Sequence, residues 1–184
     1  MPVTTLDPNT ALIVIDLQKG ILSFPTAHPK EGVIQQAGAL IEAFRRHGKP
    51  VVLVNVVGVA PGRNEQGPRA GGFPEGFADL IPEVNQQPSD ITVSKRTWGA
   101  FASTDLAARL KALEVTQVVV AGISTSAGVE STARQAYELG LNVTLAIDAV
   151  TDMNPDAHIN SVTRIFPRLG ETGTAAEIIA LLGR

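Results

Sequence analysis

Two charged residues stand directly after apolar, β-branched runs that are typical of buried strands. Asp16 follows the run 11–15, and Lys95 ends a segment that starts at Ile91. An unpaired carboxylate at the end of a buried strand is costly, so Asp16 requires a cation, and Lys95 is suited to supply it. A lysine beside a carboxylate keeps both groups charged and gives a proton-transfer pair. The competing interpretations are a cap or turn role for Asp16 and a solvated surface position for Lys95.

A second candidate is the segment from Gly122 to Gly128, which joins a predicted strand to a predicted helix. Backbone amides at a helix N-terminus suit an anion or a developing oxyanion. The glycine spacing matches neither the dinucleotide-binding fingerprint nor the P-loop, so it does not favour nucleotide binding. The hydroxyls of Ser124, Thr125 and Ser126 are expected to act as caps. A hydroxyl nucleophile is the alternative, although no nucleophile-elbow motif surrounds these residues and no histidine has an evident position to activate them.

The chain contains no cysteine, which excludes disulfides, thiolate metal sites and a cysteine nucleophile. Its three histidines, His28, His47 and His158, lie far apart in the sequence and lack the spacing of metal ligands. We expect each of them to be structural or exposed. The sequence therefore predicts neither a metal site nor a cofactor.

The composition predicts one domain over residues 1–184, of which 44% are hydrophobic. The 15 basic and 18 acidic side chains are interspersed and give a formal charge of −3, so no basic stripe is expected to bind nucleic acid or an anionic membrane. Residues 1–10 lack the basic and apolar regions of a signal peptide, and the apolar runs are too short to span a bilayer. We therefore expect a cytoplasmic protein.

Short apolar runs alternate along the chain with segments of helical periodicity. The apolar runs are residues 11–15, 51–57, 91–93, 118–121 and 143–147, and the helical segments are residues 33–47, 104–113, 127–139, 155–165 and 175–182. Continuous apolar runs are typical of strands buried on both faces of a parallel sheet. The order predicts a three-layer α/β/α domain with right-handed crossovers. Ligands bind such a sheet at the carboxyl ends of its strands, where Asp16, Lys95, the segment 122–128 and Asp148 are expected to lie.

Several helical segments carry start or stop signals. Gly48 is expected to end the first, and Asn154 to cap the fourth. Thr174 with Glu177 three residues later predicts a capping box for the last helix.

Residues 58–88 depart from this pattern, because they contain six glycines and five prolines and almost no hydrophobic periodicity. A loop of this length in a compact domain is usually functional or disordered. We expect an active-site or oligomer-contact loop with a short helical turn near residues 77–81. Plain disorder is the alternative.

Three motifs, in order along the chain, resemble the isochorismatase-like (cysteine hydrolase) superfamily. They are Ala-Leu-Ile-Val-Ile-Asp16-Leu-Gln, Lys95-Arg-Thr-Trp-Gly-Ala-Phe and Gly122-Ile-Ser-Thr-Ser-Ala-Gly128-Val-Glu-Ser-Thr-Ala, and the resemblance covers residues from about 10 to 182. It implies a six-stranded parallel sheet in the order 3-2-1-4-5-6 with helices on both faces. It also implies a homo-oligomer, a dimer or a tetramer, that acts on a small molecule.

The resemblance assigns roles to single residues. Asp16 and Lys95 match the aspartate and lysine of the family's catalytic triad, whereas Gly128 stands where the amidohydrolases carry their cysteine. A cis peptide bond is implied between Ile123 and Ser124. Isochorismatases also carry glycine at this position and hydrolyse a vinyl ether. By that resemblance Asp16 is the general acid, Lys95 holds its charge state, and the amides of Ser124 and Gly128 face the substrate.

The expected function is therefore hydrolysis of a small, anionic metabolite by acid catalysis, through vinyl-ether or related C–O or C–N cleavage without a cysteine nucleophile. The alternative is a catalytically silent relative that binds a small molecule or serves as an oligomeric interaction protein. The segment after the second strand, from Asn55, lacks the substrate-orienting glutamine, and the metal ligands of the nicotinamidases are missing, so nicotinamide is disfavoured and the substrate stays open. The side chains expected to line the pocket are Gln18, Phe24, Asn55, Trp98, Phe101 and Thr125.

Overall fold

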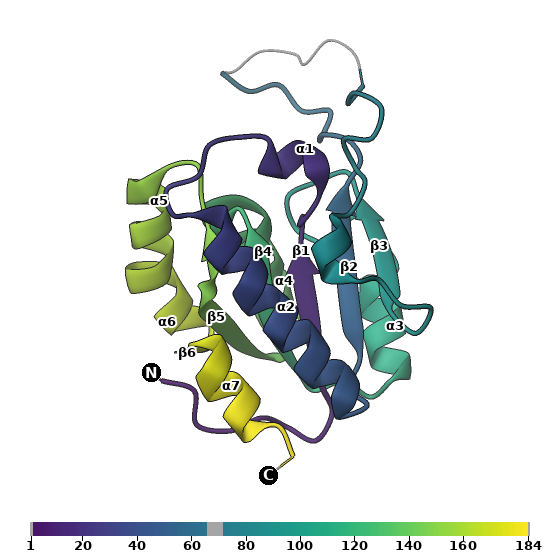
Figure 1. Cartoon of the computed structure of the whole chain (residues 1–184), viewed down its shortest axis with the longest axis vertical. Helices are drawn as coiled ribbons and strands as arrows, with labels where there is room; N and C mark the ends of the chain where they lie inside the picture. The colour runs from purple at the N-terminus through teal and green to yellow at the C-terminus, as the bar shows by residue number, and fades with distance from the viewer. Residues whose placement is uncertain (1, 66–71, 184) are drawn as a thin grey trace.

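The computed structural model describes residues 2–65 and 72–183, and within them six parallel strands form one sheet (Figure 1). The strand order is β3-β2-β1-β4-β5-β6, which confirms the predicted architecture. The strands are β1 Thr10–Ile15, β2 Val51–Val56, β3 Ile91–Lys95, β4 Gln117–Ile123, β5 Asn142–Thr151 and β6 Glu171–Gly173. From β1 the chain adds β2 and β3 on one side of the sheet and then β4, β5 and β6 on the other. A ligand-binding site is therefore expected at the carboxyl ends of β1 and β4, where the direction changes.

The two central strands explain why their sequences are continuously apolar. Every residue of β1 and β4 is buried, and the strands pair in parallel with Leu12 beside Val119. Leu12 contributes to the core on one face of the sheet and Ile13 to the core on the other. Burial on both faces therefore removes the polar alternation expected of a half-exposed strand.

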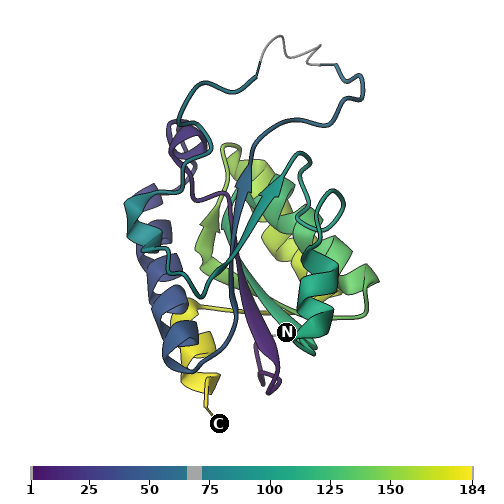
Figure 2. The same cartoon turned by 90° about the vertical axis from the view of Figure 1, so that its right-hand side faces the viewer.

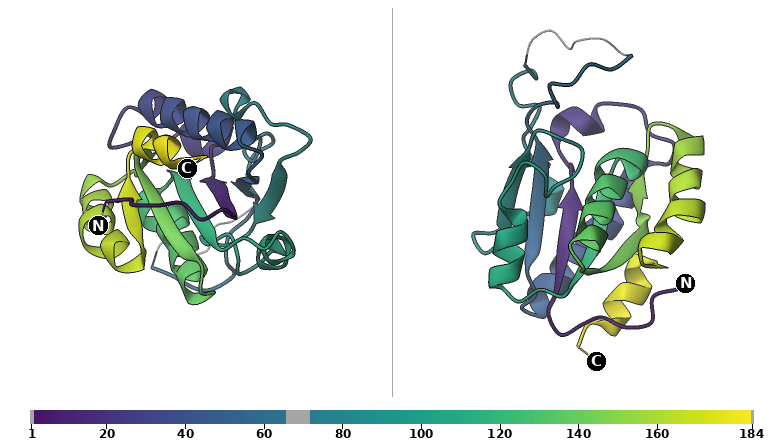
Figure 3. Two further views of the ribbon diagram at one scale, coloured as in Figure 1. Left: turned by 90° about the horizontal axis from the view of Figure 1, so that it is seen from below. Right: turned by 180° about the vertical axis from the view of Figure 1, so that it is seen from behind.

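Helices cover both faces of the sheet (Figures 2 and 3). On one face lie α2, Lys30–Arg46, and α7, Ala175–Leu181, which contribute Leu40 and Ile178 to the core there. The opposite core receives residues from α3, Leu106–Ala112, α4, Glu130–Glu138, and α6, Phe166–Leu169. The short α1, Lys19–Leu22, follows β1 at the carboxyl end of the sheet, and α5, Pro155–Asn160, follows β5. Asp16 therefore lies on the connection between β1 and α1, whereas Lys95 is the last residue of β3.

The predicted helix ends are confirmed. The Asn154 side chain accepts hydrogen bonds from the first amides of α5, and Thr174 forms a capping box with Glu177 at the start of α7. Gly48 follows α2 with φ 64°, a left-handed conformation that favours glycine.

Other boundaries differ from the predictions. The strand expected at 143–147 runs on to Thr151, because Ala149 and Val150 after Asp148 are also buried. A π-helical turn, Thr125–Val129, precedes α4. The predicted helix 155–165 consists of α5 and a second π-helical turn, Ser161–Ile165, and helical structure continues beyond its predicted end as α6. The strand β6 has three residues and no apolar run that would predict it.

The predicted loop 58–88 lies partly outside the described residues, at positions 66–71. Its later part holds a turn at 75–78 and a 3-10 turn, Pro82–Val84, in place of the helical turn expected near 77–81. Among the described residues, no helix combines the length and the apolarity needed to cross a membrane.

Candidate active site

The structure brings Asp16 and Lys95 into direct contact. Asp16 follows β1, and Lys95 is the last residue of the edge strand β3, so the lysine side chain reaches across the end of β2. Its Nζ donates to Asp16 Oδ2 over 2.7 Å. Asp16 is 5% exposed and Lys95 is 1% exposed. The site therefore holds an ion pair that is almost entirely removed from solvent.

A sharp turn aims the Asp16 carboxylate. Asp16 has φ 51°, in the left-handed region that a residue with a side chain rarely adopts. Its amide still donates to Val54 O over 2.9 Å, and its carbonyl accepts from the amide of Gln18 over 2.8 Å. The chain therefore leaves the sheet within two residues of the carboxylate. Strained backbone of this kind persists where surrounding contacts enforce it.

The two carboxylate oxygens of Asp16 have different surroundings. Oδ2 accepts from Lys95, whereas Oδ1 is buried and has no hydrogen-bond partner among the described residues. Burial raises the pKa of Asp16 from 3.8 to about 6, against the opposing effect of Lys95. A buried oxygen without a donor is better satisfied as a hydroxyl, because the neutral acid is cheaper to desolvate. Asp16 is thus suited to carry a transferable proton on Oδ1.

The raised pKa of Asp16 gives a testable dependence of stability on pH. A folded-state pKa of about 6, above the unfolded value of 3.8, adds stability that is complete below pH 3.8 and is lost as pH rises through 6. Between pH 4 and pH 7 the free energy of unfolding should fall, relative to Asp16→Asn, by up to about 3 kcal/mol, since one pKa unit corresponds to about 1.4 kcal/mol. Urea unfolding of both proteins at several pH values measures this difference. Parallel pH curves would show that Asp16 titrates normally.

Gly128 lies against this pair. A Cβ at this position would stand 2.7 Å from Ile15 Cγ2 and 3.3 Å from Asp16 Oδ2. A side chain at 128 would therefore point at the carboxylate, and glycine leaves that approach open. The geometry agrees with the place the resemblance gives to this residue, because the position faces Asp16 from the start of the helix.

The hydroxyl groups on the connection from β4 to α4 form hydrogen bonds with residues other than Asp16. The peptide bond between Ile123 and Ser124 is cis, and the hydroxyls of the next residues contact the β5–α5 side of the site. Ser124 Oγ donates to Met153 Sδ over 2.9 Å, Thr125 Oγ1 lies 2.8 Å from His158 Nδ1, and Ser126 Oγ donates to Asp152 Oδ2 over 2.8 Å. The capping role expected for these hydroxyls is absent at the helix start, where Ser124 makes no side-chain cap.

Sequence reasoning missed Asp152, and it expected His158 to be structural or exposed without predicting its contact with Thr125. Asp152 is 4% exposed and accepts from the amide of Ser126 over 2.7 Å, so it fixes the π-helical turn. His158 packs against His28 with ring centroids 4.5 Å apart, and burial, then His28, lower its pKa while Asp152 acts in the opposite direction. The apolar residues that continue past Asp148 were the available signal.

Asp148, expected at a strand end, is instead inside β5. Its Oδ1 accepts from the amide of Ala175 over 2.7 Å, which binds it to the start of α7. His47 lies at the end of α2, where its Nδ1 is 2.8 Å from Ala43 O. In the part of the chain that the structure describes, His, Asp and Glu side chains do not gather in groups of three or more that could hold a metal ion.

The six predicted pocket-lining side chains fall into two groups. Trp98 and Phe24 are 69% and 47% exposed and lie on connections that follow β3 and α1. The others are buried or half-buried: Gln18, Asn55, Phe101 and Thr125. The Asn55 side chain donates to Ala78 O over 2.8 Å, and the Gln18 carboxamide forms hydrogen bonds to main-chain groups. Both side chains therefore hold neighbouring segments of main chain in place.

Comparisons with known proteins agree with this fold. The isochorismatase domain model matches residues 10–177. The isochorismatase family protein YecD of Escherichia coli O157:H7 is 40% identical over 181 residues, covering 95% of this chain and 96% of that protein. Nicotinamidase 3 of Arabidopsis thaliana is 30% identical over 169 residues, covering 83% and 79%. The solved structure of an isochorismatase family protein from Burkholderia thailandensis has a TM-score of 0.93 at 36% identity and covers 98% of both chains.

Proposed function

Since the chain belongs to the isochorismatase family of hydrolases, we propose that it hydrolyses a small anionic metabolite by acid catalysis from Asp16, without a covalent intermediate. The observation that carries this proposal is the buried Asp16–Lys95 pair, in which Lys95 occupies Oδ2 and leaves Oδ1 without a partner. An acid with a pKa of about 6 is well matched to proton transfer near neutral pH.

Covalent catalysis has little support in this chain. It has no cysteine, and Gly128 offers no side chain beside Asp16. The hydroxyls of Ser124, Thr125 and Ser126 contact Met153 and Asp152, which follow β5, and His158 of α5. A nucleophile needs a neighbouring base and a clear approach to substrate. The expectation that no histidine is placed to activate these hydroxyls is wrong for Thr125, which lies 2.8 Å from His158 Nδ1. The Thr125 side chain is fully buried, however, so it has no clear approach to substrate.

The proposed reaction is the addition of water to a vinyl ether. Asp16 donates its Oδ1 proton to the terminal carbon of the double bond, which leaves an oxocarbenium ion at the ether carbon. Water adds to that carbon and returns a proton to Asp16. The resulting hemiketal then breaks its C–O bond, giving a ketone and an alcohol. Lys95 keeps Asp16 in place and stabilises the carboxylate that exists between the two proton transfers.

The charge of the site supports an anionic substrate. When Asp16 is protonated, the buried Lys95 has lost its counter-ion, although its side chain is only 1% exposed. An uncompensated buried cation is costly, and a carboxylate on the substrate would restore the balance. The protonated, catalytically competent site should therefore bind an anion better than a neutral molecule.

The informative experiment is incubation with isochorismate, a carboxylated vinyl ether, followed by detection of pyruvate. We expect pyruvate release above the rate of the uncatalysed reaction, and no release by Asp16→Asn. Nicotinamide serves as the contrasting amide substrate and should not be hydrolysed. If a panel of carboxylated vinyl ethers gives no product, the proposal is wrong for this class, and ligand binding without turnover would favour the binding role.

A further inference from the structure

The side chain of Gln18, two residues after Asp16, forms several hydrogen bonds close to the site. Gln18 is fully buried, and its carboxamide forms three hydrogen bonds, all to main chain. Its Oε1 accepts from Val56 N over 2.7 Å, while its Nε2 donates to Val56 O over 3.1 Å and to Phe77 O over 3.0 Å. Both amide hydrogens and the carbonyl oxygen of this buried side chain thereby have a partner.

The hydrogen bonds between Gln18 and Val56 extend the pairing of β1 with β2 beyond the last residue of β1. In the register of β1 and β2, Ile15 pairs with Val54, so Val56 would face the next residues of β1 if that strand continued. The chain instead turns away at Asp16, with φ 51°. The Gln18 carboxamide presents one acceptor and one donor to Val56, as a peptide unit would. The side chain thus satisfies the buried main chain that the turn leaves unpaired.

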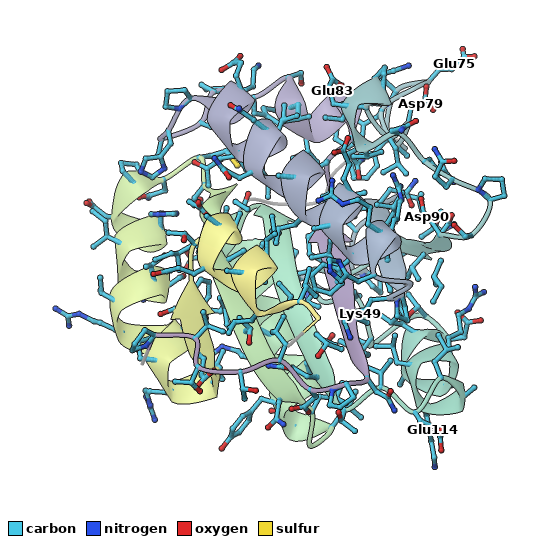
Figure 4. All side chains as sticks on the ribbon, turned by 60° about the horizontal axis from the view of Figure 1, so that its bottom comes forward. Lys49, Glu75, Asp79, Glu83, Asp90 and Glu114 are labelled. Atoms are coloured by element: carbon cyan, nitrogen blue, oxygen red, sulfur yellow. The ribbon has the colours of Figure 1, made fainter. Side chains whose placement is uncertain are left out.

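Gln18 and the two residues after it also contact the segment 77–80. Gln18 forms an antiparallel bridge with Leu80, and the amides of the next two residues donate to Asp79 O and Phe77 O over 2.9 Å. Gly20 lies directly on the Phe77 ring, since a Cβ there would stand 2.1 Å from a ring carbon. Asp79 itself lies toward the outer surface (Figure 4). Main-chain hydrogen bonds therefore hold the segment 77–80 against the catalytic turn, and the Gln18 carboxamide links both of them to β2.

We propose that Gln18 is a positioning residue for Asp16, which holds the catalytic turn against β2 and so keeps the carboxylate on Lys95. The inference rests on the proposed function for its kinetic consequences and on contacts alone for its structural ones. A carboxamide of this length is required. Methionine has the same length without donor or acceptor, and asparagine is one methylene too short to reach both groups of Val56.

The test compares Gln18→Met with Lys19→Met. Lys19 forms an exposed ion pair with Asp79, so its variant loosens the same segment without touching the carboxamide. Carboxyl ¹³C NMR titration should place the Asp16 pKa near 6 in the parent and in Lys19→Met. In Gln18→Met we expect a lower pKa, because water reaches a carboxylate that is no longer held in place. An unchanged titration in folded Gln18→Met would overturn the proposal.

Kinetics add a second readout. Misplacing a catalytic group by about 1 Å can cost about 100-fold, so kcat of Gln18→Met should fall about 10- to 100-fold with a much smaller change in KM. A rise in KM at constant kcat would instead show that Gln18 binds substrate. If the parent hydrolyses no substrate, the proposed function is wrong, but the NMR titration still tests whether Gln18 positions Asp16.

A third measurement needs no variant, in case Gln18→Met does not fold. The Val56 amide donates to Gln18 Oε1, and the Asp16 amide donates to Val54 O. Hydrogen exchange of the parent protein should protect both amides to a similar degree. Rapid exchange at Val56 beside a protected Asp16 amide would show that the carboxamide does not hold the turn.

Discussion

Replacing Asp16 with asparagine is expected to lower kcat about 100- to 10,000-fold, the range contributed by a positioned general acid. Asparagine keeps the shape of the side chain and can still accept a hydrogen bond from Lys95, but it has no acidic proton to transfer to substrate. The measurement is kcat and KM on a vinyl ether that the parent hydrolyses. Since the contact with Lys95 survives, KM should change less than kcat.

Asp90→Asn is the matched control for this variant. Asp90 is also a buried carboxylate in an ion pair, 2.5 Å from Arg45 Nη2 and 1% exposed, but it precedes β3 at the opposite end of the sheet from Asp16. It should lower stability and leave kcat intact. Equal losses of activity in the two variants would indicate a general effect of disturbed packing, and full activity of Asp16→Asn would exclude acid catalysis by this residue.

The pH profile gives the same test in the unaltered protein. The active form carries the proton on Asp16, so kcat/KM should fall as pH rises through about 6. In Lys95→Met the carboxylate loses the cation that pairs with it while staying buried. The pKa of Asp16 should therefore rise, and the falling limb of the pH profile of kcat/KM should move to higher pH. If the falling limb of the pH profile does not move in Lys95→Met, a group other than Asp16 controls kcat/KM.

The contact between Asp16 and Lys95 was predictable from sequence because it depends on topology. Both residues end apolar runs, and the carboxyl ends of parallel strands lie at one edge of the sheet. The sequence did not reveal how far Asp16 departs from the strand. The positive φ of Asp16 was not predicted, and the role of Gln18 as a substitute peptide unit depends on Val56, which lies 38 residues from Gln18 in the sequence.

The other side of the site was predicted less well, for a physical reason. The prediction ended the fifth strand at 147 because Asp148 interrupts its apolar run, yet this carboxylate is satisfied by the amide of Ala175 and the strand continues. Asp152 then occupies the strand end and binds Ser126. A polar residue inside a strand is accommodated when a distant helix start supplies donors, and no local pattern encodes that partner.

The second large effect is expected at Gly128. In Gly128→Ala the new methyl would be 2.7 Å from Ile15 Cγ2, a branched side chain buried in β1 that cannot easily move aside, and 3.3 Å from Asp16 Oδ2. Overpacking of this kind costs about 1–3 kcal/mol of stability. The methyl also occupies the approach to the carboxylate, so we expect kcat to fall about 10- to 100-fold.

Gly38→Ala makes the same substitution where it should be harmless. Gly38 lies within α2, and a Cβ there would meet nothing within 4 Å, so alanine should stabilise the helix by about 0.5–1 kcal/mol and leave kcat unchanged. The double variant of Gly128→Ala with Ile15→Ala removes the steric conflict, because Cγ2 is gone. Its loss of stability should be smaller than the sum of the two single losses, while activity stays low since the methyl still faces Asp16. Simple additivity would show that Ile15 does not confine position 128.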